Sequence, residues 1–209
     1  MPDKTLTVDI LRHGEPTGGD ILRGRIDVPL TETGWQQMRS AVGIHTPDAT
    51  PPYTHIVSSP LLRCSEFAVQ AASELGLSAT LQIESQWQEI DYGDWDGMLI
   101  DEWREHAAAQ FAAFRSDLSA LQPPNGEAYL DFRDRILTAW QSLSDLPDGS
   151  HILLVTHGGV MRVILPTVLG MPLNNSRPLH IPFACRSRIQ LHGGGENWQA
   201  SLLSHNACD

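Results

Sequence analysis

Cysteine is scarce in this sequence of 209 residues, which contains only Cys64, Cys185 and Cys208. These three form no CxxC pair and no zinc-finger pattern, so neither a disulfide framework nor a structural metal site is expected. A chain of this length buries enough apolar surface to form a stable core without such cross-links. We therefore expect a protein with reduced thiols in the cytoplasm.

Positive charge is also in short supply. Lys and Arg number 14 against 25 Asp and Glu, which leaves a formal net charge of −11. Nucleic acids and anionic membrane surfaces attract proteins with a net positive field, so neither is expected as a partner. A small anionic ligand would have to be held by a local basic pocket that overcomes the overall repulsion.

Long apolar runs, repeats and low-complexity segments are absent. No run reaches the ~20 residues that a membrane span requires. Residues 1–5 lack the charged-then-apolar pattern of a signal peptide, which again favours a cytoplasmic protein. The oligomeric state does not follow from the composition, and both a monomer and a homodimer are possible.

Three segments repeat the order of apolar strand, polar turn and helix. The strands are expected at Leu6–Leu11, His55–Val57 and His151–Val155. Ser59 is expected to cap the helix after the second strand, and Gly76 to end it. Strands that alternate with helices predict an α/β fold with a mostly parallel central sheet and helices on both faces.

The strand pattern is interrupted between residues 98 and 146. Two helical patterns, Ile100–Leu118 and Glu127–Leu143, take its place. About 50 residues form a poor core alone, so we interpret this part as a small helical insertion over the site. Residues 1–209 are then one domain, and the tail at 187–203 is expected to form a hairpin at the sheet edge.

Basic and imidazole side chains follow all three predicted strands. Arg12 and His13 follow the first, Arg63 lies one turn into the helix after the second, and His157 follows the third. In open α/β sheets, ligands bind at the carboxyl ends of the strands. Two guanidinium groups and two imidazoles at this edge suit a phosphoryl group, which Arg binds bidentately. Each residue alone could be structural or a surface charge; their joint position favours a site.

Glycines accompany these side chains. Gly14 follows His13, and Gly158 and Gly159 follow His157. Glycine allows a ligand to approach the backbone closely, and helix N-termini add N–H donors and partial positive charge. Tight packing is the alternative explanation for the glycine pair.

Five sequence blocks carry a resemblance to a known family. They are RHG at residues 12–14, RIDVPLTETG at 25–34, SSPLLRC at 58–64, EIDYGDWDG at 89–97 and VTHGGVMR at 155–162. In this order they resemble the motifs of the histidine phosphatase superfamily, the phosphoglycerate-mutase-like proteins. The blocks span most of the chain, and five together are far more specific than RHG alone.

The resemblance implies catalytic roles for three residues. His13 would be the nucleophile that forms a phosphohistidine, since imidazole is largely neutral near pH 7. His157 would act with Arg12 and Arg63 on the phosphoryl oxygens, with Gly14 and Gly158 also at the phosphate.

Glu89 would be the general acid and then the base. This role requires a raised pKa, which burial under the insertion and the neighbouring Asp91 or Asp94 could supply. The alternative is that Glu89 belongs to an acidic surface turn.

The resemblance also implies a substrate. Residues 22–35 and 89–95 are most similar to the α-ribazole phosphatases, which act on α-ribazole 5′-phosphate in cobalamin biosynthesis. The insertion is shorter than in the mutases of the family, which favours hydrolysis. A broad-specificity small-molecule phosphatase or a phosphoglycerate mutase-type enzyme is the alternative.

No cofactor and no metal are expected, because Arg and His already neutralise a phosphoryl group. A non-catalytic docking module and a metal-dependent hydrolase are the alternatives from other classes.

Two further features are open. Many family members have Asn six residues after the nucleophile, where this chain has Gly19; a backbone N–H or Thr17 would have to replace it. Trp35, Trp95 and Trp103 either stack on a flat base or pack in the core.

Overall fold

A six-stranded sheet forms the centre of the computed structural model, which describes residues 3–44, 52–176, 178–194 and 197–206. Cys208, residues 1–2 of the N-terminal segment and residues 195–196 of the expected hairpin lie outside the described residues. The strand order is β3-β2-β4-β1-β5-β6. The strands are β1 (Lys4–Arg12), β2 (His55–Ser58), β3 (Leu81–Ile83), β4 (His151–Thr156), β5 (Arg186–Gly194) and β6 (Asn197–His205).

Pairing in the sheet is mixed but mostly parallel. β4 pairs in parallel with both β1 and β2, and β2 pairs in parallel with β3. β5 runs antiparallel to β1 and to β6, which places this strand pair at one edge of the sheet. The predicted parallel sheet and the predicted antiparallel pair at its edge are both confirmed.

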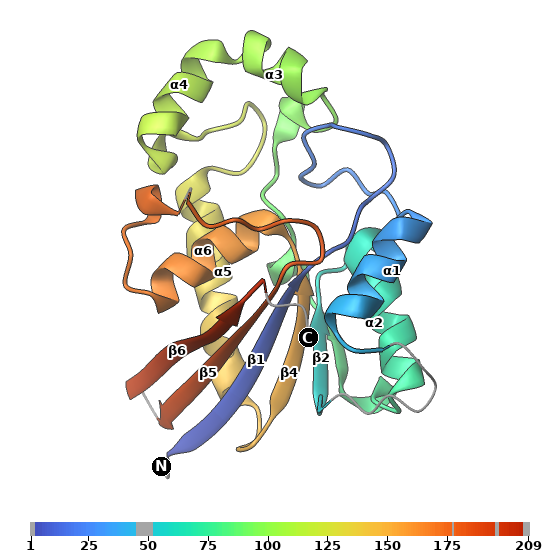
Figure 1. The fold of residues 1–209 in the computed structure, drawn as a ribbon. Helices are drawn as coiled ribbons and strands as arrows, with labels where there is room; N and C mark the ends of the chain where they lie inside the picture. Colours follow the sequence, from blue (N-terminus) through green and yellow to red (C-terminus); the bar gives the residue numbers. More distant parts are fainter. Residues whose placement is uncertain (1–2, 45–51, 177, 195–196, 207–209) are drawn as a thin grey trace.

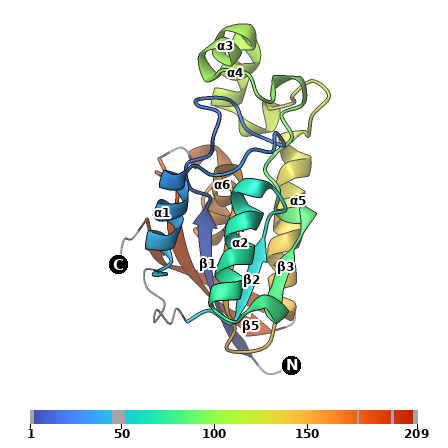
Figure 2. The same ribbon diagram turned by 90° about the vertical axis from the view of Figure 1, so that its right-hand side faces the viewer.

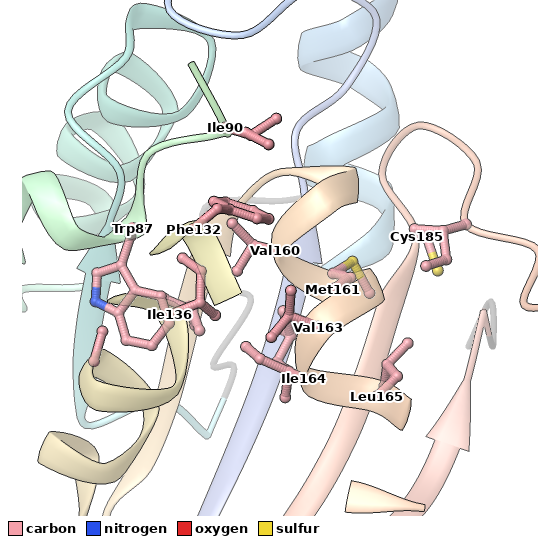
Figure 3. Packing of buried hydrophobic residues seen from close by; sticks show 14 of the residues in the cluster. Trp87, Ile90, Phe132, Ile136, Val160, Met161, Val163, Ile164, Leu165 and Cys185 are labelled. Atoms are coloured by element: carbon pink, nitrogen blue, oxygen red, sulfur yellow. The ribbon is translucent and has the colours of Figure 1, made fainter. Parts of the chain in front are cut away.

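Helices cover both faces of the sheet (Figure 1). Helices α1 (Glu32–Ala41) and α2 (Leu62–Glu74) lie on one face, and α5 (Tyr129–Ser142) and α6 (Gly158–Val168) lie on the other. Because alternate strand residues point to opposite faces, β4 contributes Leu154 to one core and Leu153 to the other. Figure 3 shows the first core, where α6 faces Ile136 of α5 and Trp87 lies beside Ile136.

The helical segment after residue 98 divides into two parts. Helix α5 packs against α6 beside the sheet, whereas α3 (Ile100–His106) and α4 (Ala108–Ser116) stand beyond the end of the sheet (Figures 1 and 2). The expected single helix over Ile100–Leu118 is broken at Ala107, whose backbone leaves helical geometry while its side chain is buried.

Some elements differ from the expectations. The predicted cap at Ser59 is wrong. Helix α2 begins at Leu62 after the cap residue Leu61, which has no capping side chain, and the Ser59 hydroxyl lies two residues earlier, 2.7 Å from His157 Nε2. Helix α1, which the sequence analysis missed, begins where Thr31 Oγ1 accepts the N–H of Gly34 (3.0 Å). Strand β3, with three residues, was also missed.

Short 3-10 helices complete the described elements: η1 (Ser78–Thr80), η2 (Ser85–Trp87), η3 (Gly93–Trp95), η4 (Leu118–Ala120), η5 (Leu143–Asp145) and η6 (Leu173–Asn175). Among the helices described, none has the length and apolar character needed to cross a membrane. Cys64 and Cys185 are buried and form no disulfide.

Candidate active site

A cavity of about 400 Å³ lies where β1 and β4 end. Five of the residues expected at the site line it: Arg12, His13, Glu89, Gly158 and Gly159. Arg63 and His157 are fully buried and are not among the lining residues. The sheet edge that the sequence indicated therefore holds a real cavity.

A hydrogen bond to the backbone of the next residue fixes the orientation of the His13 ring. Its Nδ1 lies 2.8 Å from the carbonyl oxygen of Gly14, which can only accept, so Nδ1 carries the proton. The lone pair is then on Nε2. Burial, followed by the positive charges of Arg63 and Arg12, lowers the pKa of His13 well below 6.5. The imidazole is thus neutral at physiological pH, as a nucleophile requires.

His157 lies beside His13, with ring centroids 5.3 Å apart. Its Nε2 is 2.7 Å from Ser59 Oγ, and Cys64 Sγ lies 3.7 Å from the same nitrogen. Burial and the charge of Arg63 lower the pKa of His157 well below 6.5. Burial raises the pKa of the Cys64 thiol to about 12, so this cysteine is not a competing nucleophile.

Arg12 is fixed by contacts on two sides of its guanidinium. Nη1 donates to the carbonyl of Ile181 (2.7 Å), and the guanidinium carbon lies 4.4 Å from the centroid of the Phe183 ring. Its Nε is buried and has no hydrogen-bond partner among the described residues. An anion in the cavity would satisfy this donor.

Arg63 is held from behind by a single short segment. Its Nη2 donates to the carbonyl of Gly24 (2.7 Å) and its Nη1 donates to the carbonyl of Ile26 (2.9 Å). The N–H groups of residues 24–26 all donate to the carboxylate of Asp96, each at 2.7 Å. Asp96 therefore fixes the segment that orients Arg63.

Glu89 faces the same cavity with its carboxyl buried. The N–H groups of Gly159 (2.8 Å) and Ile90 (3.1 Å) donate to it. Burial raises its pKa, and this effect exceeds the opposing effect of the two N–H donors and of Arg63 and Arg12. The carboxyl can thus hold a proton at higher pH than an ordinary Glu.

The two acidic neighbours of Glu89, Asp91 and Asp94, accept hydrogen bonds from other residues and do not contribute to the raised pKa of Glu89. Asp91 accepts the N–H of Gly93 (2.8 Å), and Asp94 accepts from Asn125 Nδ2 (3.0 Å). The part of the expectation that rested on Asp91 or Asp94 therefore has no support in the structure, whereas the part that rested on burial does.

The three glycines expected at the site, Gly14, Gly158 and Gly159, differ in whether they line the cavity or allow close packing. A side-chain carbon at Gly159 would collide with the Glu89 carboxyl, so only glycine lets this carboxyl reach the start of α6. Gly14 is packed against the backbone of Gly34 and is not among the cavity-lining residues. Gly158 lines the cavity beside Arg12.

Sequence reasoning missed several residues of the cavity wall, including Tyr92, Arg162 and Phe183. Arg162 follows Gly158 by four residues on α6, so helical periodicity would have placed both on one face. Its Nη1 donates to the carbonyl of Ser176 (3.1 Å).

The loop that carries Gly19 brings a different side chain to the cavity. Neither Thr17 nor Gly19 lines the cavity, but Arg23 does. Its Nη2 donates to the carbonyls of Thr17 (2.9 Å) and Gly19. Arg23, four residues after Gly19, is thus the cation that this loop brings to the cavity wall.

The three tryptophans considered for stacking lie in the cores. Trp95 and Trp103 are buried with ring centroids 6.0 Å apart, and Trp35 packs on Phe67. None of the three lines the cavity. Across the described residues, no three His, Cys, Asp or Glu side chains are grouped so that they could hold a metal ion.

A mostly parallel sheet whose strand ends bring an Arg–His pair to a cavity that a buried carboxyl also lines is an arrangement suited to phosphoryl groups. The family model described as the histidine phosphatase superfamily (branch 1) matches residues 8–204. The chain belongs to this superfamily, whose members are phosphatases and mutases.

Individual relatives agree with this assignment. The protein called "Probable phosphoglycerate mutase GpmB" in Salmonella choleraesuis (strain SC-B67) is 31% identical over 198 residues, which cover 94% of this chain and 89% of the relative. A mycobacterial glucosyl-3-phosphoglycerate phosphatase has a TM-score of 0.79 at 25% identity, covering 99% of this chain and 100% of its own. The α-ribazole phosphatase from Shigella flexneri has a TM-score of 0.79 at 24% identity, covering 96% of each chain, and shows the fold alone.

Proposed function

We propose that this chain is a phosphomonoester hydrolase that acts through a phosphohistidine on His13. The observation that carries the proposal is the pairing of a neutral, buried imidazole with a buried carboxyl of raised pKa on one cavity. A nucleophile must be unprotonated and a general acid protonated at the same pH, and these two environments favour that combination.

In the first step, His13 Nε2 attacks the phosphorus atom. The bond between phosphorus and the ester oxygen breaks, and Glu89 gives its proton to the departing alkoxide. Arg12 and Arg63 would hold the phosphoryl oxygens, with His157 alongside, where negative charge is concentrated in the transition state.

In the second step, water attacks the phosphohistidine. Glu89, now a carboxylate, takes the proton from this water, and the bond between phosphorus and Nε2 breaks. Inorganic phosphate leaves, and His13 and Glu89 return to their starting protonation states. The reaction needs no co-reactant besides water, and none of these steps calls on a cofactor or metal.

For the substrate we propose α-ribazole 5′-phosphate, and with it a role in cobalamin biosynthesis in the cytoplasm. Its support is the likeness of residues 22–35 and 89–95 to the α-ribazole phosphatases. A homodimer likewise stays a prediction.

A phosphoglycerate mutase-type enzyme or a broad-specificity phosphatase is the second candidate. It is favoured by the 31% identity to the protein called a probable phosphoglycerate mutase. Arg162 on the cavity wall is a cation that a carboxylate on such a substrate could meet.

Turnover of a panel separates these substrates. We would compare α-ribazole 5′-phosphate with 3-phosphoglycerate, fructose 2,6-bisphosphate and common nucleotides, with and without a chelator. The highest kcat/KM on α-ribazole 5′-phosphate is expected. No turnover of any compound would favour a docking module, and loss of activity on chelation that added metal restores would favour a metal-dependent hydrolase.

The covalent route has its own test. His13→Ala is expected to abolish turnover, because no other neutral imidazole lines the cavity within the described chain. Rapid quenching of the wild type with labelled substrate should leave acid-labile, base-stable phosphate on the protein. Wild-type turnover with no such label would count against the phosphohistidine.

A further inference from the structure

A second, smaller chamber of about 70 Å³ adjoins the catalytic cavity. The two share Tyr92, Phe114, Gly159 and Arg162 as wall residues, so the chamber continues from the place where Glu89 meets α6. Nothing in the proposed mechanism uses this space.

The remaining walls of the chamber are almost entirely apolar. They come from the segment after η2, from η4 and from α5, and comprise Ile90, Leu118, Leu121, Tyr129 and Phe132 beside Ser176. All are buried, so this is a recess lined by core residues beside Phe114 of α4, continuous with the catalytic cavity, and not an exposed patch. Water in such a space is poorly hydrogen-bonded, and an apolar group would displace it favourably.

One polar atom in this wall has no partner. Tyr129 is only 7% exposed, and its buried hydroxyl makes no hydrogen bond within the described chain. Burial raises its pKa to about 12, so it stays a neutral phenol that can both donate and accept. Buried hydroxyl groups are normally paired, so a ligand in the chamber that brings a hydrogen-bonding atom within reach would satisfy this one.

We propose that this chamber, together with the adjoining part of the catalytic cavity that shares its walls, binds an apolar ring of the leaving alcohol, and that Tyr129 pairs with a hydrogen-bonding atom on that ring. The substrate class is then a phosphomonoester of an alcohol with a ring-containing, mostly apolar end. The inference rests on the proposed function only in placing the phosphoryl group at His13.

Binding of compounds that cannot be hydrolysed tests the chamber independently of catalysis. Calorimetry would compare propylphosphonate with 3-phenylpropylphosphonate, which differ only in the ring. Wild-type protein is expected to bind the phenyl compound at least about tenfold more tightly, as burial of a ring predicts. Equal dissociation constants would overturn the proposal, whereas failure of the hydrolase would show only in the turnover panel.

A matched pair of variants locates the effect. Leu121→Phe fills the chamber and is expected to reduce the preference for the phenyl compound to about threefold or less while propylphosphonate still binds. Leu143→Phe makes the same change at a site with the same 4% exposure in the same core, away from the chamber, and should keep the preference. A preference unchanged by Leu121→Phe would overturn the proposal.

Tyr129→Phe provides a second test that does not depend on tolerance of a larger side chain. It removes only the unpartnered hydroxyl. Binding of 3-(4-pyridyl)propylphosphonate is expected to weaken by roughly threefold to tenfold, with the phenyl compound unchanged within about twofold. Equal effects on both compounds would exclude the proposed hydrogen bond.

Discussion

At the scale of single residues, the cavity separates two titrating groups by giving them different surroundings. His13 is buried among the charges of Arg63 and Arg12, which oppose its protonation. Glu89 is buried at the start of α6, where loss of water opposes its ionisation. Burial thus favours the neutral form of both, which is the form in which each begins the proposed reaction.

Glu89→Gln tests this arrangement through the leaving group. Without a proton donor, alkyl phosphates, whose alkoxides leave poorly, should lose about 10²–10⁴-fold in kcat/KM, and aryl phosphates far less. Initial rates on a series of esters measure the difference. Equal losses on both kinds of ester would remove Glu89 as the acid.

The pH profile of kcat/KM supplies the control for the same variant. Activity on alkyl esters should fall as pH rises through the raised pKa of Glu89, because the acid loses its proton. On the acid side, activity should fall only well below pH 6.5, where His13 becomes protonated. Glu89→Gln should remove the alkaline limb and keep the acid limb.

At the scale of elements, the loop over residues 17–30 is fixed by a neighbour distant in sequence. Asp96, which follows η3, accepts the three N–H groups of residues 24–26, and the carbonyls of this segment hold Arg63. Because a small misplacement of a charged group weakens transition-state stabilisation strongly, Asp96 is a positioning residue for Arg63.

Asp96→Asn is expected to reduce kcat/KM by about 10–100-fold and to weaken inhibition by inorganic phosphate, since an amide cannot accept all three N–H groups. The dependence on leaving group should stay as in the wild type, because Glu89 is untouched. Asp94→Asn, an exposed change in the same 3-10 turn, is the matched control and should have little effect. Equal phosphate inhibition in Asp96→Asn and wild type would contradict this role.

At the scale of the whole molecule, a buried carboxylate joins the central strands. Asp9 of β1 accepts from Arg188 of β5 (2.7 and 2.8 Å) and from the Tyr53 hydroxyl (3.0 Å), with His151 of β4 nearby (3.5 Å). Burial opposes its ionisation, but the hydrogen bonds and charge of Arg188, with a smaller effect from the nearby His151, hold the pKa of Asp9 well below its usual range. Ionised Asp9 therefore stabilises the sheet.

Asp9→Asn is expected to lower the free energy of unfolding by about 3 kcal/mol at pH 7, because it breaks a buried charge pair. The folded pKa lies below the unfolded value of about 3.9, so the stability that Asp9 contributes is fully present above the unfolded value. It is lost as pH falls from there through the folded pKa. The difference between variant and wild type in urea unfolding should thus shrink below about pH 4. Asp101→Asn changes an exposed ion pair, and its free energy of unfolding should match that of the wild type at every pH. A difference for Asp9→Asn that does not change with pH would exclude the link between Asp9 ionisation and stability.

The sequence by itself determined the strands β1, β2, β4, β5 and β6 of the sheet, the cavity edge and the family. Strand and helix periodicities are local, and the motifs carrying Arg12, His13, Glu89 and His157 are contiguous stretches of chain. Since parallel strands present their carboxyl ends at one edge, these local signals were enough to bring the motifs to one region.

Only the tertiary structure decided how these residues are held. The three N–H donors on Asp96, the contact of Glu89 with Gly159 and the chamber beside Tyr129 each join segments that are far apart in the sequence. Helix α1 and strand β3 were missed for a related reason, because a ten-residue helix and a three-residue strand depend on their packing partners more than on their own pattern. Burial, which sets the pKa values and the shape of the cavity, is a property of the packed chain and has no counterpart in local sequence.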